Sequence, residues 1–114
     1  MEEKYFDFKG NIVTVNEKGV IYRNYKYSFK AIKGLLDYHD MSLKDSFYFV
    51  DKICTLLFRI LHNLAYDKHS TSNSIIRTTR HRTGKDNVYR GLKSKLSKLQ
   101  DLKEEIKFSL RVQA

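Results

Sequence analysis

The stretch 42–66, SLKDSFYFVDKICTLLFRILHNLAY, constrains the fold of this chain more than any other. Its apolar residues recur at alternating steps of four and three, which is the spacing that places side chains on one face of a helix. This stripe consists of Leu43, Phe47, Val50, Cys54, Leu57, Leu61 and Leu64. A second group widens it: Phe49, Ile53, Leu56, Phe58 and Ile60. A helix that is apolar nearly all round is buried on several sides, so we expect the rest of the chain to pack around this one.

A shorter helix is expected just before the central one. Over residues 28–38 the apolar positions again follow helical spacing, and Ser28 is a candidate cap. The polar run at 37–40 is expected to end this helix. Ser42 then supplies an N-cap for the central helix, with Asp45 as an acidic residue in its first turn.

Residues 5–27 alternate in the manner of β-strands and predict a three-stranded antiparallel meander. Lys9-Gly10 can close the first hairpin as a two-residue loop, and the segment 16–19, NEKG, suits the second. This register would pair Phe6 with Val13 across the first hairpin. It predicts one apolar face that covers the helices, made of Phe6, Phe8, Val13, Val15, Val20 and Tyr22.

A long amphipathic helix is predicted at 87–112. Its apolar residues step by three and four: Val88, Leu92, Leu96, Leu99, Leu102, Ile106 and Leu110. Their mean spacing is close to the period of a straight helix, which favours packing on a domain over a sustained two-stranded coiled coil. The preceding segment, 67–86, is polar and basic. It is expected to be either a loop or a short helix around 74–80.

These elements predict one α+β domain over residues 1–114. It would consist of the meander at 5–27, two helices at 28–66, the basic polar segment at 67–86 and the long helix at 87–112. A chain of 114 residues with 41% hydrophobic residues can bury a core without disulfides. The single cysteine, Cys54, is expected to be a small buried hydrophobe in a reducing compartment.

No apolar run approaches the ~18–20 uncharged residues that a membrane span needs. Asp51, Lys52 and Arg59 interrupt the best candidate. The first residues, MEEKYFDF, lack the basic and then apolar layout of a signal peptide. We therefore expect a cytoplasmic protein without a membrane partner.

The chain is basic, and the excess of positive charge is unevenly distributed. The formal net charge is +9. Residues 1–70 carry eleven basic and nine acidic side chains, whereas residues 71–114 carry eleven basic and four acidic ones. A positive field of this kind favours anionic partners, and its clustering is more informative than its total.

The basic residues cluster most densely over 77–98, where Asp86 is the one acidic residue. The candidate site consists of Arg77, Arg80, His81, Arg82, Lys85, Arg90, Lys93, Lys95 and Lys98. Arginine forks and hydroxyl donors, which alternate in the sequence RTTRHRTGK, suit phosphate oxygens. The other interpretation is a solvated surface that opposes aggregation.

A secondary surface is expected on the sheet, where aromatic and basic residues alternate. It consists of Arg23, Tyr25, Lys26 and Tyr27. Aromatic side chains among cations can stack nucleic-acid bases. The competing interpretation is ordinary packing, since the expected register turns the neighbouring Tyr22 toward the core.

Catalytic and metal chemistry are not expected. The histidines and nearby carboxylates show no recognised zinc-ligand spacing, and there is no cysteine pair. Arg59 with His62, and Arg77 with His81, could each place a proton donor beside a cation, but no pocket can be inferred for either pair. The sequence predicts a non-enzymatic protein without cofactor or metal.

The leading hypothesis is a small basic protein that binds nucleic acid, or a nucleoprotein complex, through the segment 77–98. The alternative is a phage or mobile-element inhibitor or adaptor that binds a host protein directly. It would dock on the acidic surface of a nucleic-acid-handling protein, for example as an anti-defence protein in the channel of a nuclease. A third interpretation is a homodimer formed through an exposed stripe on the last helix.

Overall fold

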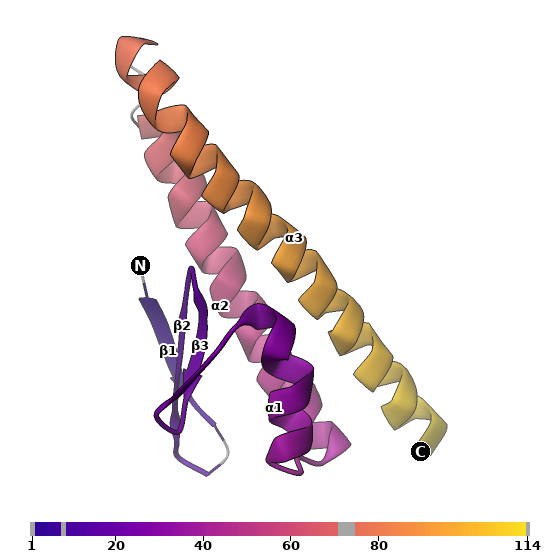
Figure 1. Cartoon of the computed structure of the whole chain (residues 1–114). Helices are drawn as coiled ribbons and strands as arrows, with labels where there is room; N and C mark the ends of the chain where they lie inside the picture. The colour runs from indigo at the N-terminus through magenta and orange to yellow at the C-terminus, as the bar shows by residue number, and fades with distance from the viewer. Residues whose placement is uncertain (1, 8, 71–74, 114) are drawn as a thin grey trace.

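The computed structural model describes residues 2–7, 9–70 and 75–113, with the backbone alone described at 66–70 and 75–87. Within these residues the chain forms a four-stranded antiparallel sheet and three α-helices, so the predicted α+β class is confirmed (Figure 1). The strands are β1 (Glu2–Phe6), β2 (Ile12–Asn16), β3 (Gly19–Tyr22) and β4 (Tyr25–Tyr27). The helices are the 3-10 turn η1 (Phe29–Ala31), α1 (Ile32–Tyr38), α2 (Leu43–Ser70) and α3 (Ile75–Gln113).

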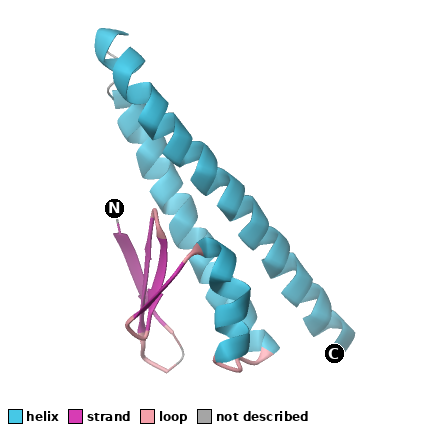
Figure 2. Cartoon of the chain, in the orientation of Figure 1, coloured by secondary structure: helices cyan, strands magenta, loops and turns pink. Residues whose placement is uncertain are grey.

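The sheet covers one side of the helical half, and α2 occupies the centre of the molecule. The strands follow one another in the order β1-β2-β3-β4. Helix α2 contacts β1 and β2 on one side and runs beside α3 on the other. Figure 2 shows the strands gathered on one side of the long helix pair. The central position that the sequence predicts for α2 is therefore the observed one.

The β2–β3 hairpin has the predicted register, with Val15 opposite Val20. The side-chain oxygen of Asn16 accepts hydrogen bonds from the backbone N–H groups of Lys18 and Gly19, at 2.8 and 3.1 Å. Gly19 has a φ of +149°, and a Cβ atom added there would lie 2.1 Å from a backbone oxygen of β4. Glycine is therefore required at this turn by both its backbone angle and the close approach of β4.

The predicted register of β1 is wrong by one residue. Phe6 lies opposite Ile12 rather than Val13, and its side chain is 66% exposed. The first hairpin closes between Asp7 and Asn11, whose backbones hydrogen-bond at 2.9 Å, and Gly10 has a positive φ of 81°. A three-residue loop of this kind replaces the expected two-residue loop. Because strand side chains alternate, this shift turns every β1 residue to the opposite face.

Tyr5 consequently takes the core-facing position that the sequence pattern predicts for Phe6. Its ring meets that of Phe49 edge to face, at 6.2 Å between ring centres. The Tyr5 hydroxyl donates a hydrogen bond to the backbone oxygen of Phe49 at 3.4 Å. Phe8, which was expected on this face as well, lies outside the described residues.

Strand β4 was not predicted. It follows β3 through a two-residue turn in which Arg23 and Asn24 both have positive φ angles, of 52° and 69°. This combination is typical of the type I′ turn, whose twist suits a tight hairpin. The sequence signal is weak, because Arg23-Asn24 is not one of the Asn-Gly, Asp-Gly or Gly-Gly pairs that indicate such a turn.

Helix α2 begins where the sequence predicts. The Oγ of Ser42 accepts a hydrogen bond from the backbone N–H of Asp45 at 3.1 Å, which satisfies one of the free amides of the first turn. The helix continues to Ser70, beyond the predicted end at Tyr66. Ser28 precedes η1 but forms no side-chain capping bond.

Helix α3 begins at Ile75 rather than at Asn87. The basic segment at 67–86 was expected to be a loop or a short helix. Instead, its first residues belong to the end of α2, and its residues from Ile75 onward form the first turns of α3. Positions 71–74 lie outside the described residues. The polar composition of this segment does not end a helix, since arginine and lysine have good helix propensities. The chain also contains no proline to break it.

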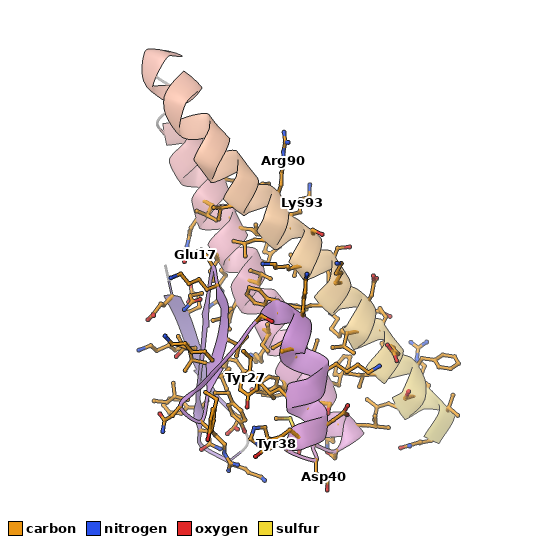
Figure 3. The ribbon with its side chains drawn as sticks, viewed as in Figure 1. Glu17, Tyr27, Tyr38, Asp40, Arg90 and Lys93 are labelled. Atoms are coloured by element: carbon orange, nitrogen blue, oxygen red, sulfur yellow. The ribbon has the colours of Figure 1, made fainter. Side chains whose placement is uncertain are left out.

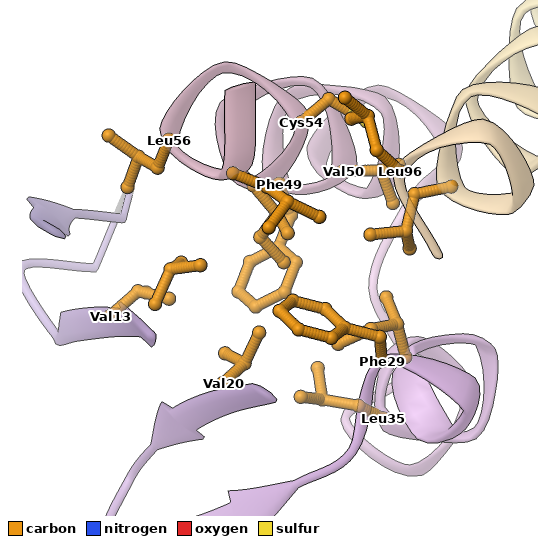
Figure 4. Packing of buried hydrophobic residues seen from close by; sticks show 14 of the residues in the cluster. Val13, Val20, Phe29, Leu35, Phe49, Val50, Cys54, Leu56 and Leu96 are labelled. Carbon is orange, nitrogen blue, oxygen red and sulfur yellow. The ribbon is translucent and has the colours of Figure 1, made fainter. Parts of the chain in front are cut away.

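The core lies where the sheet, η1, α1, α2 and α3 meet (Figure 4). Its ten largest fully buried side chains among the described residues are Phe49, Ile32, Leu35, Ile53, Leu57, Ile60, Val13, Val15, Val20 and Val50. The predicted stripe of α3 contributes Leu92, Leu96, Leu99 and Ile106. Phe58, which was expected to widen the buried stripe of α2, is instead 63% exposed.

Candidate functional site

The residues of the predicted basic site all lie on one helix, α3. The side chains of Arg77, Arg80, His81, Arg82 and Lys85 lie outside the described part of the structure. Those of Arg90, Lys93, Lys95 and Lys98 are described, and the site can be built from these four.

The buried leucines of α3 fix its rotation and thereby the direction of its cations. Leu92, Leu96 and Leu99 are buried in the core, whereas Arg90 and Lys93, on other faces of these turns, are exposed. Arg90 and Lys93 project away from the sheet into solvent (Figure 3). Within the described side chains, neither of them forms an ion pair with a carboxylate.

Lys95 and Lys98 lie on the side of α3 that faces η1 and α1. The Nζ of Lys95, a half-buried residue, is 6.0 Å from the centre of the Phe29 ring. Lys98 lines an open groove of about 420 Å³, whose floor includes Phe29 and Leu99. The two sides of this part of α3 therefore carry separate pairs of cations.

The opposite wall of this groove contributes two lysines that were not selected from the sequence, Lys30 and Lys33. Both are exposed, one in η1 and one in α1. Because they are three residues apart in a predicted helix, the sequence predicts that they share one face of that helix. The sequence does not predict that this face packs beside α3. The fold thus brings four lysines to the neighbourhood of one groove.

Two carboxylates also line the groove, those of Asp101 and Glu105. The Nζ of Lys33 is 3.8 Å from a carboxylate oxygen of Glu105, and both side chains are 66% exposed. An exposed ion pair of this kind contributes little to stability and exchanges readily with other partners. The α3 side of the groove therefore changes from basic at Lys98 to acidic at Asp101 and Glu105, and Lys33 faces the acidic part from α1.

The predicted secondary surface on the sheet is not brought together as expected. Tyr25 and Tyr27 lie opposite Tyr22 and Val20, on the core-facing side, whereas Lys26 lies opposite Ile21 on the outer side. Arg23 is in the turn, with its guanidinium carbon 5.9 Å from the centre of the Tyr22 ring. The tyrosines and Lys26 thus point to different faces of the sheet and do not form a common stacking surface.

A second polar cluster lies where the β1–β2 loop meets the connection between α1 and α2. The hydroxyl of Tyr22 donates to a carboxylate oxygen of Asp7 at 2.6 Å. The Tyr22 ring also meets the His39 ring edge to face, at 5.1 Å between ring centres. These side chains border a small pocket of about 80 Å³, room for a few water molecules and too small for most organic ligands.

The pKa values of this cluster reflect its hydrogen bonds. Burial, followed by the bond to Asp7, raises the pKa of Tyr22 to about 12. Burial alone would raise the pKa of Asp7, but the bonds that it accepts from Tyr22 and Asn11 outweigh burial and lower it. Burial, with the positive charges of Arg23 and Lys9, lowers the pKa of His39. Each shift favours the protonation state that the packing requires.

The remaining candidate groups are placed as follows. Cys54 is buried, and burial raises the pKa of its thiol to about 11. His62 is exposed on α2, and the side chains of His69 and His81 lie outside the described residues. Among the described side chains, no three histidine, cysteine or acidic groups are arranged to hold a metal ion.

None of the helices, as far as the structure describes them, has the length and apolar character needed to cross a membrane. Searches against protein-family models, curated proteins and solved structures found no match to this chain.

Proposed function

We propose that this protein binds nucleic acid through the basic part of α3. The observation that carries the proposal is the set of four described cations, Arg90, Lys93, Lys95 and Lys98, which share one helix and pair with no described carboxylate. Cations without an acidic partner on a rigid element are suited to phosphate oxygens. The five further basic residues predicted for the site precede them on the same helix.

The helix pair favours contact with phosphates over reading of bases. A helix with its side chains is about 10–12 Å across, and a neighbouring helix axis lies a further ~8–10 Å away. The pair formed by α2 and α3 is wider than the major groove of B-DNA, which is about 12 Å, so only the outer side of α3 could enter it, and the described cations on that side, Arg90 and Lys93, suit phosphates. Binding through the outer side of α3 would therefore be electrostatic and weakly dependent on sequence.

The first test measures binding of the purified protein to single- and double-stranded DNA and RNA by fluorescence anisotropy at low salt. We expect binding to more than one sequence, with an affinity that falls steeply as salt is raised, because each neutralised phosphate releases counterion. Absence of binding to all four kinds of nucleic acid would contradict the proposal.

Charge reversal identifies the surface. We expect Arg90→Glu with Lys93→Glu, and separately Arg77→Glu with Arg80→Glu and Arg82→Glu, to weaken binding on every sequence. The slope of log K against log salt should become shallower by about 0.9 for each duplex phosphate that the variant no longer neutralises. The melting temperature of the Arg90 and Lys93 variant should barely change, since these exposed charges contribute little to stability. Lys4→Glu with Lys18→Glu, at exposed positions on the sheet side, is the control for net charge of the Arg90 and Lys93 double variant.

The competing proposal is a direct inhibitor or adaptor that docks its cations on the acidic surface of a nucleic-acid-handling protein. The same charge reversals would weaken that complex, so they do not separate the two proposals. Capture of partners from a host lysate, with and without nuclease treatment, separates them. Capture of one protein that survives nuclease treatment, together with no binding to purified nucleic acid, would favour the inhibitor.

A further inference from the structure

The charge of α3 changes along its length, and this change marks where its basic surface ends. Its exposed charged residues are basic from Arg90 to Lys98, and the next ones along the helix are Asp101, Glu104 and Glu105. A polyanion that follows α3 from its N-terminal half would meet repulsion at Asp101. The cations that continue the surface at this point are on another element.

Lys30 and Lys33 provide that continuation. They line the same groove as Lys98, and Phe29, the residue next to Lys30, lies under Lys95. Lys33 is held by Glu105 alone among the described carboxylates, through an exposed contact of 3.8 Å that a phosphate can replace. The basic surface therefore turns from α3 across the groove toward η1 and α1.

The groove offers no exposed ring on which a base could stack. Phe29 is 4% exposed, and none of the exposed aromatic residues among the described side chains lines the groove: Phe6, Tyr25, Tyr38, Phe58 and Phe108. Stacking on aromatic side chains is a main source of affinity for single strands. A duplex hides its bases and presents a dense row of phosphates, which suits lysines that have no exposed aromatic ring beside them.

We propose that Lys30 and Lys33 belong to the same binding surface as Lys95 and Lys98, and that this surface takes the phosphates of a double-stranded nucleic acid. The inference rests on the proposed nucleic-acid function. It adds η1 and α1 to the interface that α3 provides, and it assigns double-stranded nucleic acid as the ligand.

The first experiment compares two double variants with the same net charge. Lys30→Gln with Lys33→Gln removes the groove lysines, and Lys4→Gln with Lys18→Gln removes two exposed lysines from the sheet side. With a duplex of about 20 base pairs, the groove variant should lose roughly tenfold or more in affinity at about 0.1 M salt. Its salt slope should fall by about 1.8, which corresponds to two phosphate contacts. The control variant should stay close to the parent in both quantities.

The second experiment seeks a gain of affinity, which damage to the fold would not produce. Glu105→Gln releases Lys33 and removes the acid beside the groove, whereas Glu104→Gln removes the same charge from the neighbouring exposed position outside the groove. We expect the Glu105 variant to bind duplex several-fold more tightly than the Glu104 variant. Equal affinities would overturn the role of the groove.

The outcomes separate the inference from the function on which it rests. If the parent binds duplex and Arg90→Glu with Lys93→Glu weakens it, but the groove variant equals its control, the function stands and the role of Lys30 and Lys33 is overturned. A single strand of equal length that binds as tightly as the duplex overturns the assigned ligand class. A parent protein that binds no nucleic acid overturns both.

Discussion

Asp7 is the residue that holds the β1–β2 loop in place. Its carboxylate accepts hydrogen bonds from the backbone N–H groups of Lys9 and Asn11, at 2.9 and 2.8 Å, and from the Tyr22 hydroxyl. These bonds close the loop and connect it to β3. They are made to the ionised carboxylate, so the conformation of the loop depends on the charge of one side chain.

The stability of the protein should therefore fall in acid. The folded pKa of Asp7 is lowered, so its contribution is complete above the unfolded value of about 4 and is lost as pH falls through the folded pKa. His39 acts in the same direction from about pH 6.5 downward, because its folded pKa is also lowered and the unfolded chain takes up the proton more readily. Urea unfolding from about pH 7.5 to about pH 3 measures this decrease.

Asp7→Asn should be less stable than the parent at about pH 7 and should lose less stability between about pH 5 and pH 3 (a window of about two units around the ordinary carboxyl pKa). Tyr22→Phe removes one donor to the carboxylate, so the Asp7 pKa followed by carbon NMR should be higher in this variant than in the parent. An Asp7 pKa that is equal in both would show that the Tyr22 bond does not hold the carboxylate charged.

Some residues of the candidate site could be predicted from the sequence, and others could not. The density of basic residues over 77–98 follows from the printed sequence, and on α3 Arg90, Lys93 and Lys98 are exposed as expected, whereas Lys95 is half-buried. Lys30 and Lys33 could not be selected, because two lysines three residues apart are common on the exposed face of any helix. Their proximity to Lys98 arises from the packing of η1 against α3, which depends on contacts between residues far apart in the sequence.

At the level of elements, the two hairpins differ in how far their turns reveal the register. The side chain of Asn16 and the glycine at 19 define a two-residue turn, and the pairing of β2 with β3 follows from it. The first turn also contains a glycine, but the bonds to Asp7 place its start one residue earlier than Lys9-Gly10 suggested. A hydrogen bond from the backbone to the Asp7 side chain favours the longer loop over the two-residue turn. The alternation of apolar residues along the strands does not reveal such a bond.

Neighbouring substitutions on β1 test the observed register. Tyr5→Lys should lower the free energy of unfolding by about 1–3 kcal/mol, because it places a charge against Phe49 and the core. Phe6→Lys should change it by no more than about 0.5 kcal/mol, because this side chain is exposed. Chemical denaturation measures both. The reverse order of stabilities would restore the register expected from the sequence.

For α3, the sequence predicts the presence of a helix correctly but not the residue at which the helix begins. The leucine stripe from Leu92 onward identified the helix, and these residues are buried or packed against the core as expected. Before that point the apolar pattern is too sparse to distinguish a helix from a loop, so the predicted start was too late. The backbone continues as a helix back to Ile75, as the pair of long helices in Figure 1 shows.

The whole molecule is elongated because the helix pair is longer than the sheet. Its extents are 55 × 29 × 18 Å, and its radius of gyration is 16.1 Å. A compact domain of this length would have a radius of gyration of about 13 Å. The predicted leucine stripe of α3 is largely buried within the chain, and Phe108 and Val112 are apolar residues near the end of this helix that remain exposed.

Small-angle X-ray scattering tests this shape. A single chain should give a radius of gyration near 16.1 Å, slightly increased by its hydration layer, and a mass of 13.5 kDa. A value near the ~13 Å of a compact domain would mean that the helix pair does not extend in solution. A mass that doubles as concentration is raised would support the homodimer, and Phe108→Glu with Val112→Glu should then restore the single chain.

The antiparallel helix pair has a consequence for how such a protein can vary. Among the described side chains, the buried cluster reaches Leu61 on α2 and Leu92 on α3, and the helical backbone continues beyond both. About seven residues added to each helix beyond these points would lengthen the pair by about 10 Å and nearly preserve the angular phase of the two helices. Insertions of this kind would leave the core intact, so the length of the helix pair beyond the core can vary independently of the stability of the core.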